Sequence, residues 1–486
     1  METRIERDSM GEMRVPVDAL YGATTQRAVE NFPISGRPLP RAFLRALGLI
    51  KKAAASVNQD LGAIDATLAQ AIRQAADEVA DGKLDAHFPI DVYQTGSGTS
   101  TNMNANEVIA NRACQLLGAP IGSREKVHPN DHVNRGQSSN DVIPTALHVA
   151  CAEEVRMRLI PALRRMHEAL RQKSEDFDDV LKIGRTHLQD ATPLRLGQVF
   201  GGFAAQLERS IERLEAVMPR LCELALGGTA VGTGINCPAG FAAKVIAKLE
   251  IETHLPFVEA GDHFEAQAAR DAAVELSGAL KSVAVSLYHI ANNIRWLGSG
   301  PRCGIGELVL PAVQPGSSIM PGKTNPVICE SLIMVCCQTI GNDTAITYGG
   351  FGGVGSLLDL NVAMPMMAHN LLDSIHLTSN ACRMFTANLL SGPSNGGLQP
   401  DEAKCKSLIE GSLAMCTSLV PVIGYDKSAA LAKEAFKQGK TVRQLAYETV
   451  VGQAGNDGKK ITKADIDTYL DPWSMTLPGG EGSAGG

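Results

Sequence analysis

Four polar stretches contain the residues of this sequence whose types and spacing could do chemistry. They read QTGSGTSTNMNANE at 94–107, HPNDHVNRGQSSND at 128–141, GRTHLQDATP at 184–193 and GSSIMPGKTNP at 316–326. Small hydrogen-bond donors dominate them, and His187 and Lys323 add one imidazole and one ammonium group. Several neutral donors beside one positive charge suit the recognition of a carboxylate. The four stretches therefore indicate proton transfer on a substrate that carries carboxylates.

The position of these stretches relative to expected helices supports a ligand site. Three of the four run directly into segments with helical spacing, which begin near Glu107, Val142 and Val327. A helix N-terminus presents free backbone N–H groups and a partial positive charge, so it attracts anions. The alternative is that these residues are ordinary helix caps and turns. Because one cap serves one helix, the several Ser, Thr and Asn residues in each stretch favour a ligand.

Several other reaction classes lack their signatures in this chain. The sequence has neither the GxxxxGK[ST] loop of nucleotide-binding proteins nor the GxSxG turn of serine hydrolases. Cys, His and Asp residues do not cluster at the spacing of a metal site. We therefore expect no metal and no organic cofactor.

Long helices must position the polar stretches. Apolar residues recur every three or four positions across 147–170, 199–221 and 276–297, and again from 328 onward. Helices of this length measure roughly 35–50 Å and usually pack side by side in a bundle. A further segment, 357–390, is apolar nearly all round, so we expect a buried helix with a kink at Pro365. Strand patterns of comparable strength are absent, so any sheet should be small.

These patterns predict an all-α protein of three regions. We expect an N-terminal domain of loops and shorter helices at 1–140 and a central long-helix bundle at 141–395. The stretch SGPSNGGLQP at 391–400 reads as a boundary, and a small helical C-terminal domain should cover 396–476. The Gly-rich end, 477–486, has no means of packing and should be flexible.

Composition excludes some partners. Aromatic residues are only 4% of the 486, which suits close helix packing, and the net charge of −7 argues against nucleic acid. The 11 cysteines are scattered and odd in number, as in a reducing compartment rather than a disulfide scaffold. No leader pattern opens the chain and no apolar run is long enough to span a membrane. We therefore expect a cytoplasmic protein without a membrane partner.

The stretch at 316–326 resembles the motif GSSxMPxKxNP of the fumarase/aspartase superfamily. The other three stretches match that superfamily in the same order and at similar spacing, as does RIERDSMGEMRVP near the start. The resemblance covers the chain from about Arg4 to about Lys440. Within the superfamily, the chain is most similar to the class II fumarases, which hydrate fumarate to (S)-malate without a metal.

The resemblance implies a role for each residue at a matching position. Ser317 would be the base, Lys323 would stabilise charge, and His187 with Glu330 would handle the water. Residues implied to bind the substrate or the water are Ser97, Thr99, Ser138, Ser139, Asn140, Thr186, Lys323 and Asn325. A second anion site is implied at His128, Asn130 and Asp131, although a simple turn explains these three nearly as well.

The resemblance also implies partners. The ligand would be a small dicarboxylate, fumarate or malate. The chain would form a homotetramer with a multi-helix core, and each active site would be shared between subunits. No cofactor is implied.

Two alternatives remain open at this level. An aspartase-like ammonia-lyase would share the fold, but such enzymes typically have Thr, Gln and Ala where this chain has Ser139, His187 and Gly322. A catalytically silent structural relative would also share it, although every implied catalytic position is intact here. Ammonia release from aspartate tests the first alternative, and measurable turnover tests the second.

Overall fold

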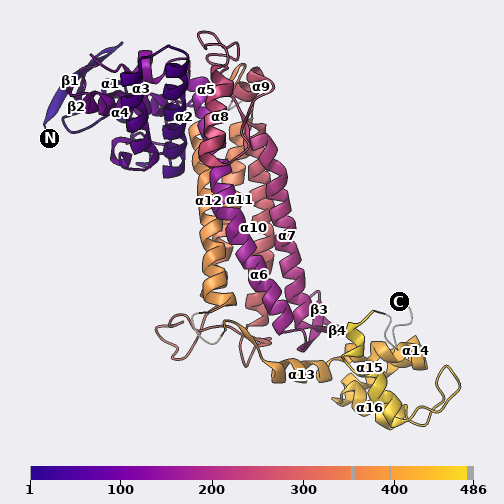
Figure 1. Ribbon diagram of the computed structural model, residues 1–486. Coiled ribbons are helices and arrows are strands. Elements are labelled where there is room, and N and C mark those ends of the chain that lie inside the picture. The colour runs from indigo at the N-terminus through magenta and orange to yellow at the C-terminus, as the bar shows by residue number, and fades with distance from the viewer. Residues whose placement is uncertain (1, 352–355, 393–395, 479–486) are drawn as a thin grey trace. The chain divides into compact units, whose positions relative to one another are not determined.

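The computed structural model describes residues 2–351, 356–392 and 396–478. Most of these residues lie in α-helices (Figure 1). The described residues contain 17 α-helices, and their strands form five short two-stranded sheets. The all-α prediction is therefore confirmed. The segment predicted to be a flexible tail, 477–486, falls from 479 onward outside the described residues.

The chain divides into two compact units. One comprises 1–163, 210–285 and 334–380, and the other comprises 164–209, 286–333 and 381–486. The boundaries fall within the five long helices, each of which contributes residues to both units. These helices are α6 (Ile160–Asp176), α7 (Leu196–Leu221), α10 (Asp271–Leu297), α11 (Val327–Gly350) and α12 (Met364–Phe385). The three-region division expected from sequence stays a prediction.

The first unit begins with a hairpin and a group of shorter helices. Its elements are β1 (Thr3–Asp8), β2 (Gly11–Pro16), α1 (Ala23–Asn31), α2 (Arg41–Asp60), α3 (Ala66–Ala80), α4 (Thr99–Leu116) and α5 (Ser139–Glu154). Short 3₁₀ and π turns lie at Asp85–His87 and Pro129–Val133. The helices α2 and α3 pack together closely, because Gly48 of α2 lies directly against the backbone of Ala76 and Ala80.

Parts of the long helices complete the first unit. The buried carboxylate of Asp343 in α11 accepts hydrogen bonds from Ser277 and Lys281 of α10, at 2.7 and 2.6 Å. Asn342 of α11 donates to Ser374 of α12 at 3.0 Å. The remaining elements are a π turn (Val155–Leu159), β5 (Glu223–Leu224), α8 (Phe241–Thr253), β6 (Val258–Glu259), α9 (His263–Ala268), β8 (Ser356–Leu357) and β9 (Leu360–Asn361).

The second unit combines other parts of the long helices with the C-terminal helices. Its elements are β3 (Leu181–Thr186), β4 (Gln189–Arg195), β7 (Leu308–Val309), β10 (Gln399–Pro400), α13 (Glu402–Gly411), α14 (Val420–Ile423), α15 (Tyr425–Gln438), α16 (Val442–Thr449) and α17 (Lys463–Tyr469). Single turns occupy Thr386–Leu390, Leu413–Leu419 and Ser474–Thr476. Leu419, Leu431, Leu445 and Ile466 form a small apolar core, which Ile183 of β3 joins.

The sequence analysis placed a kinked helix over 357–390, and this detail is wrong. The residues Ser356–Asn361 form a short hairpin, and α12 begins only at Met364. Pro365 is therefore the second residue of the helix, where its missing N–H costs nothing, and it produces no kink. The side chain of Asn361 accepts a hydrogen bond from Ala363 N at 3.0 Å and fixes the chain just before the helix.

In the described part of the chain, no single helix is long and apolar enough to cross a membrane. One bent pair, Glu402–Gly411 with Leu413–Ile423, meets that criterion only when both members are taken together across a 67° bend.

Candidate active site

The N-terminus of α4 carries two of the expected binding residues. Ser97 Oγ lies 2.8 Å from Thr99 Oγ1, and Gly98 between them has a φ of +72°, which favours glycine. Gly96 is equally constrained, because a Cβ at this position would lie 1.6 Å from the carbonyl oxygen of Val362. Gly96 therefore serves a close backbone approach, and Gly98 serves a left-handed turn at the start of the helix.

The N-terminus of α5 carries three more. Ser138 caps the helix: its hydroxyl accepts from Asn140 N, while Ser138 N donates to Asp141 Oδ1 at 2.9 Å. The other carboxylate oxygen of Asp141 accepts from Gly227 N and Thr229 N, both at 3.0 Å. Burial raises the pKa of Asp141, and its three N–H donors oppose that rise. Asp141 thus fastens the loop after β5 to this helix end.

The two helix ends lie side by side. Asn102 Nδ2 of α4 donates to Ser139 Oγ of α5 at 3.0 Å. A Cβ on Gly98 would lie 2.8 Å from a methyl carbon of Ile143, which shows how closely the helices approach. The structure therefore brings together the expected binding residues Ser97, Thr99, Ser138, Ser139 and Asn140. Two adjacent helix N-termini with several hydroxyl groups can hold a carboxylate.

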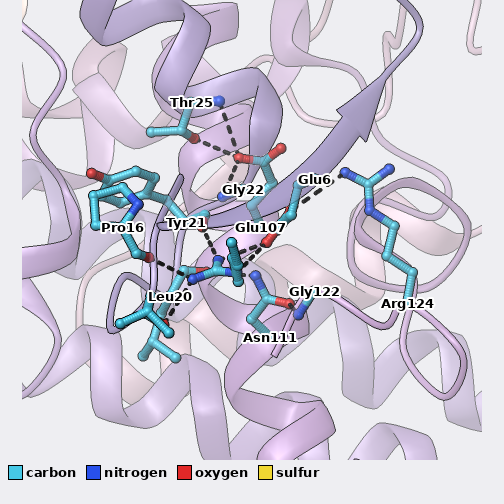
Figure 2. Close-up of polar contacts among 12 residues, drawn as sticks. Glu6, Pro16, Leu20, Tyr21, Gly22, Thr25, Glu107, Asn111, Gly122 and Arg124 are labelled. Atoms are coloured by element: carbon cyan, nitrogen blue, oxygen red, sulfur yellow. Dashed lines mark hydrogen bonds and ion pairs between the residues drawn. The ribbon is translucent and has the colours of Figure 1, made fainter. Parts of the chain in front are cut away.

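Other polar residues of the 94–107 stretch are structural. Figure 2 shows Glu107 reaching the start of α1, where its carboxylate accepts from Gly22 N at 2.8 Å and from Thr25 Oγ1 at 2.7 Å. One turn further along α4, Asn111 donates to Leu20 O at 2.8 Å and accepts from Gly122 N at the same distance (Figure 2). These bonds fix α4 against the N-terminal segment.

The expected second anion site is a capped turn. His128 Nδ1 accepts from Asn130 N and Asp131 N, at 3.3 and 3.2 Å. His128 Nδ1 also lies 3.2 Å from Asp131 Oδ2, so Nε2 is the ring nitrogen left to contact a ligand. The turn and an anion site are thus compatible at His128.

In the second unit, the third polar stretch forms a β-hairpin with His187 at its tip. The strands β3 and β4 pair from Leu181 with Arg195 to Thr186 with Gln189, so His187 and Leu188 are the two loop residues. Their φ angles are +59° and +61°, a left-handed pair that hairpins usually form with Asn and Gly. A His-Leu pair there stores strain, which motivates a functional role for the exposed His187.

A buried charge cluster holds the base of this hairpin. Glu307 has no exposed surface, and its Oε2 accepts from Arg185 at 2.9 Å and lies 3.2 Å from Lys182 Nζ. Burial lowers the pKa of Lys182, and the nearby Glu307 carboxylate opposes that shift. Both cations belong to β3, so Glu307, which directly precedes β7, fastens this strand of the hairpin.

The fourth stretch is a loop closed on itself before α11. Asn325 Nδ2 donates to Gly316 O at 2.6 Å across its base. Ser317 Oγ accepts two backbone hydrogen bonds, from Met320 N at 3.0 Å and from Ile319 N at 3.3 Å. Lys323 is exposed, as is Glu330 in the first turn of α11. The loop therefore offers one hydroxyl with two N–H donors beside a free ammonium group.

Three of the expected site residues have side chains without a polar partner in the described part of the chain. Among residues 2–351, 356–392 and 396–478, the side chains of His187, Lys323 and Glu330 form no hydrogen bond or ion pair. The two helix ends belong to the first unit, whereas Thr186, His187, Ser317, Asn325 and Glu330 belong to the second.

The sequence analysis missed the residues that support these groups. They are Lys51, Asn102, Asn134, Asp141 and Glu307. A signal existed for Lys51, since it follows Leu47 by four positions on the apolar face of α2, where a lysine is unexpected. Asp141 also carried a signal, because it follows Ser138 by three positions as in a capping box, whereas the partners of Asn102 and Glu307 are distant in sequence.

The chain is similar to known proteins over nearly its whole length. The chain matches the lyase family over residues 11–341 and the fumarase C C-terminus family over residues 415–477. It is 53% identical to a class II fumarate hydratase of Corynebacterium glutamicum over 475 residues, 98% of this chain and 96% of that protein. It is also 53% identical to the mitochondrial fumarate hydratase of Rattus norvegicus over 477 residues, 98% of this chain and 90% of that protein.

A solved structure shows the same fold. The crystal structure of recombinant class II fumarase from Schistosoma mansoni has a TM-score of 0.92 and 39% sequence identity. The match covers 98% of this chain and all of that one.

Proposed function

The chain belongs to the class II fumarate hydratase family of lyases, and we propose that it interconverts fumarate and (S)-malate with Ser317 as its base. In the direction of dehydration, the malate C–H bond breaks and its electron pair forms the double bond. The proton passes to Ser317, and the C–O bond breaks. The departing hydroxide takes a proton from the protonated imidazole of His187 and leaves as water.

One observation carries the assignment of Ser317. A serine hydroxyl is a weak base unless its alkoxide is stabilised, and hydrogen bonds to the charged form lower a pKa. The two backbone N–H groups of Ile319 and Met320 point at Ser317 Oγ and provide that stabilisation. Lys323, six residues along the same loop, adds a positive charge near the carboxylate on which charge develops.

His187 is the proposed group for the water. An imidazole can both accept and donate a proton near neutral pH, which a glutamine at this position could not do. Glu330 would fix the protonated ring once the two side chains meet. Because neither side chain has a partner within the described residues, both are available to a neighbouring subunit.

The remaining expected residues would hold the substrate. We assign one carboxylate to the paired helix ends, where Ser97, Thr99, Ser139 and Asn140 offer small donors. Thr186, Lys323 and Asn325 would bind the other, since one amide hydrogen of Asn325 stays free after its bond to Gly316. His128 with Asn130 and Asp131 remains the candidate for a second anion site.

We also propose a homotetramer with shared sites, acting in the cytoplasm and without a metal or cofactor. The unpaired His187, Lys323 and Glu330 support shared sites. All 11 cysteines are free thiols, which supports a reducing compartment. Gel filtration and activity in the presence of a chelator test the assembly and the metal independence.

The deciding experiment follows the ultraviolet absorbance of fumarate after (S)-malate is added to the purified protein. Wild type should raise the absorbance, and Ser317→Ala should reduce kcat by at least about a thousand-fold, because a base acting in the transition state is lost. Thr324→Val, an exposed and nearly isosteric change in the same loop, should retain wild-type activity.

The possible outcomes distinguish the role of Ser317 from the choice of reaction. If Ser317→Ala retains most of the activity, Ser317 is not the base. If wild type is silent on malate but releases ammonia from aspartate, the hydratase assignment and the proposed role of His187 are both wrong.

A further inference from the structure

Lys51 of α2 is a buried lysine close to the paired helix ends. Its side chain has no exposed surface, and its Nζ donates to Asn134 Oδ1 and to Gln137 Oε1, both at 2.9 Å. Within the described residues no carboxylate lies within ion-pair distance of it. Buried lysines are rare unless they are paired with a charge, so neutral amide partners are unusual.

Lys51 fixes the direction of a series of hydrogen bonds. Its Nζ donates to both Asn134 and Gln137, and it carries N–H donors whether charged or neutral, so Asn134 presents its Oδ1 to Lys51 and therefore also to Asn102. Asn102 Nδ2 donates to that oxygen at 3.2 Å and to Ser139 Oγ at 3.0 Å. If the oxygen and nitrogen of the Asn102 amide were exchanged, its Oδ1 would face Asn134 Oδ1, and both of these oxygens are acceptors.

The last group in this series of hydrogen bonds is the hydroxyl of Ser139, which is proposed above to bind the substrate. Because Ser139 Oγ already accepts from Asn102, its own hydrogen is free to be donated. A free hydroxyl hydrogen at a helix N-terminus is what a carboxylate oxygen requires. Lys51 thus fixes the orientation of the Asn134 and Asn102 amides, and this orientation leaves the hydroxyl hydrogen of Ser139 free.

We propose that Lys51 is a positioning residue of the hydratase: it orients Asn134 and Asn102 so that Ser139 donates its hydrogen to a substrate carboxylate. The inference rests on the proposed role of Ser139 in binding substrate. A purely structural role explains the arrangement less well, because an apolar side chain of similar volume usually fills such a site at lower cost than a buried charge.

The test compares Lys51→Met with Lys52→Met. Lys52 is the next residue of α2 and binds Asp77 and Glu252 at the surface, so it controls for the loss of a lysine from this helix. Lys51→Met should raise KM for malate by about ten-fold to a hundred-fold, the range for one lost hydrogen bond to a charged group, with kcat changed far less. Lys52→Met should keep the wild-type KM, and Lys51→Arg, which retains donors, should recover part of the loss.

A double-mutant cycle links the effect to Ser139. Once Ser139→Ala has removed the hydroxyl, adding Lys51→Met should change KM little. If the two changes multiply instead, or if Lys51→Met alone leaves KM at the wild-type value, the positioning role is overturned. If Ser139→Ala alone leaves KM unchanged, the proposed binding role of Ser139 fails, and this inference loses its premise.

If Lys51→Met does not fold, a second variant tests the connection between Lys51 and Ser139. Asn102→Leu leaves Lys51 in place but removes the amide that joins Asn134 to Ser139. It should reproduce the rise in KM, and a wild-type KM in this variant would overturn the inference. Thermal unfolding of each variant establishes that the folded protein is compared.

Discussion

Arg185 Nη1 lies 2.9 Å from Glu307 Oε2, and this ion pair anchors the hairpin whose tip is His187. Lys182 approaches the same oxygen at 3.2 Å, and Glu307 is completely buried. Two cations therefore depend on one carboxylate that is remote in sequence, and all three residues support the hairpin that carries the proposed catalytic imidazole of His187.

Glu307→Gln should be strongly destabilising. The change leaves Lys182 and Arg185 without their counter-charge in a buried place, which typically costs about 3–5 kcal/mol. We expect a large fall in the free energy of unfolding and, because the hairpin loses its support, at least a ten-fold fall in kcat/KM. Chemical denaturation and malate turnover measure the two effects.

The matched control is Glu410→Gln, which removes a carboxylate from a partly exposed pair with Arg443 at 3.4 Å. Exposed ion pairs contribute less than about 1 kcal/mol, so stability and turnover should hardly change. Equal losses in both variants would mean that the buried cluster does not support the hairpin.

Gly96→Ala should disturb the α4 helix end. Its Cβ would lie 1.6 Å from Val362 O, so the backbone must move, at a typical cost of about 1–3 kcal/mol. Because Ser97 is the next residue, KM should rise as well. Gly202→Ala, in α7 with nothing within 4 Å of the new Cβ, should instead stabilise by up to about 1 kcal/mol. Comparing thermal unfolding and KM of the two variants tests the close approach at Gly96.

Leu188 should tolerate only certain replacements. It is 69% exposed, so little packing is lost, but its φ is +61°. Asn adopts left-handed conformations readily, and Leu188→Asn should stabilise by about 0.5–1 kcal/mol. Leu188→Val, which is β-branched, should destabilise by a similar amount. The opposite order in thermal unfolding would argue against a strained turn.

Lys51 should make stability depend on pH. Burial lowers its pKa from 10.5 to about 7. Between about pH 7 and 10.5 the unfolded chain therefore keeps a proton that the folded protein has released, so the free energy of unfolding should rise with pH over this range. The slope from one group is at most about 1.4 kcal/mol per pH unit. Denaturation at pH 7, 8 and 9 should show this slope in Lys52→Met and a smaller one in Lys51→Met.

Sequence patterns predicted the long helices because burial repeats at the helical period over many turns, as in α7 and α10. They also located two helix starts closely, since α5 begins at Ser139 and α11 at Val327, whereas α4 begins at Thr99, well before the expected Glu107. Local signals cannot show that Asp141 binds the backbone 86 to 88 residues away, or that Glu307 holds a hairpin 122 residues before it. The predicted kink at Pro365 was wrong because proline breaks the interior of a helix but is favoured in its first turn.

The cap on α1 has a consequence for the timing of synthesis. Gly22 N and the threonines at the start of this helix bond to Glu107, a residue 85 positions later than Gly22. At about 5–20 residues per second, the ribosome needs about 4 to 17 s to add that stretch. Throughout this interval the emerging N-terminal helix has no carboxylate at its end, so the nascent chain must wait for α4 before its first helix can be completed.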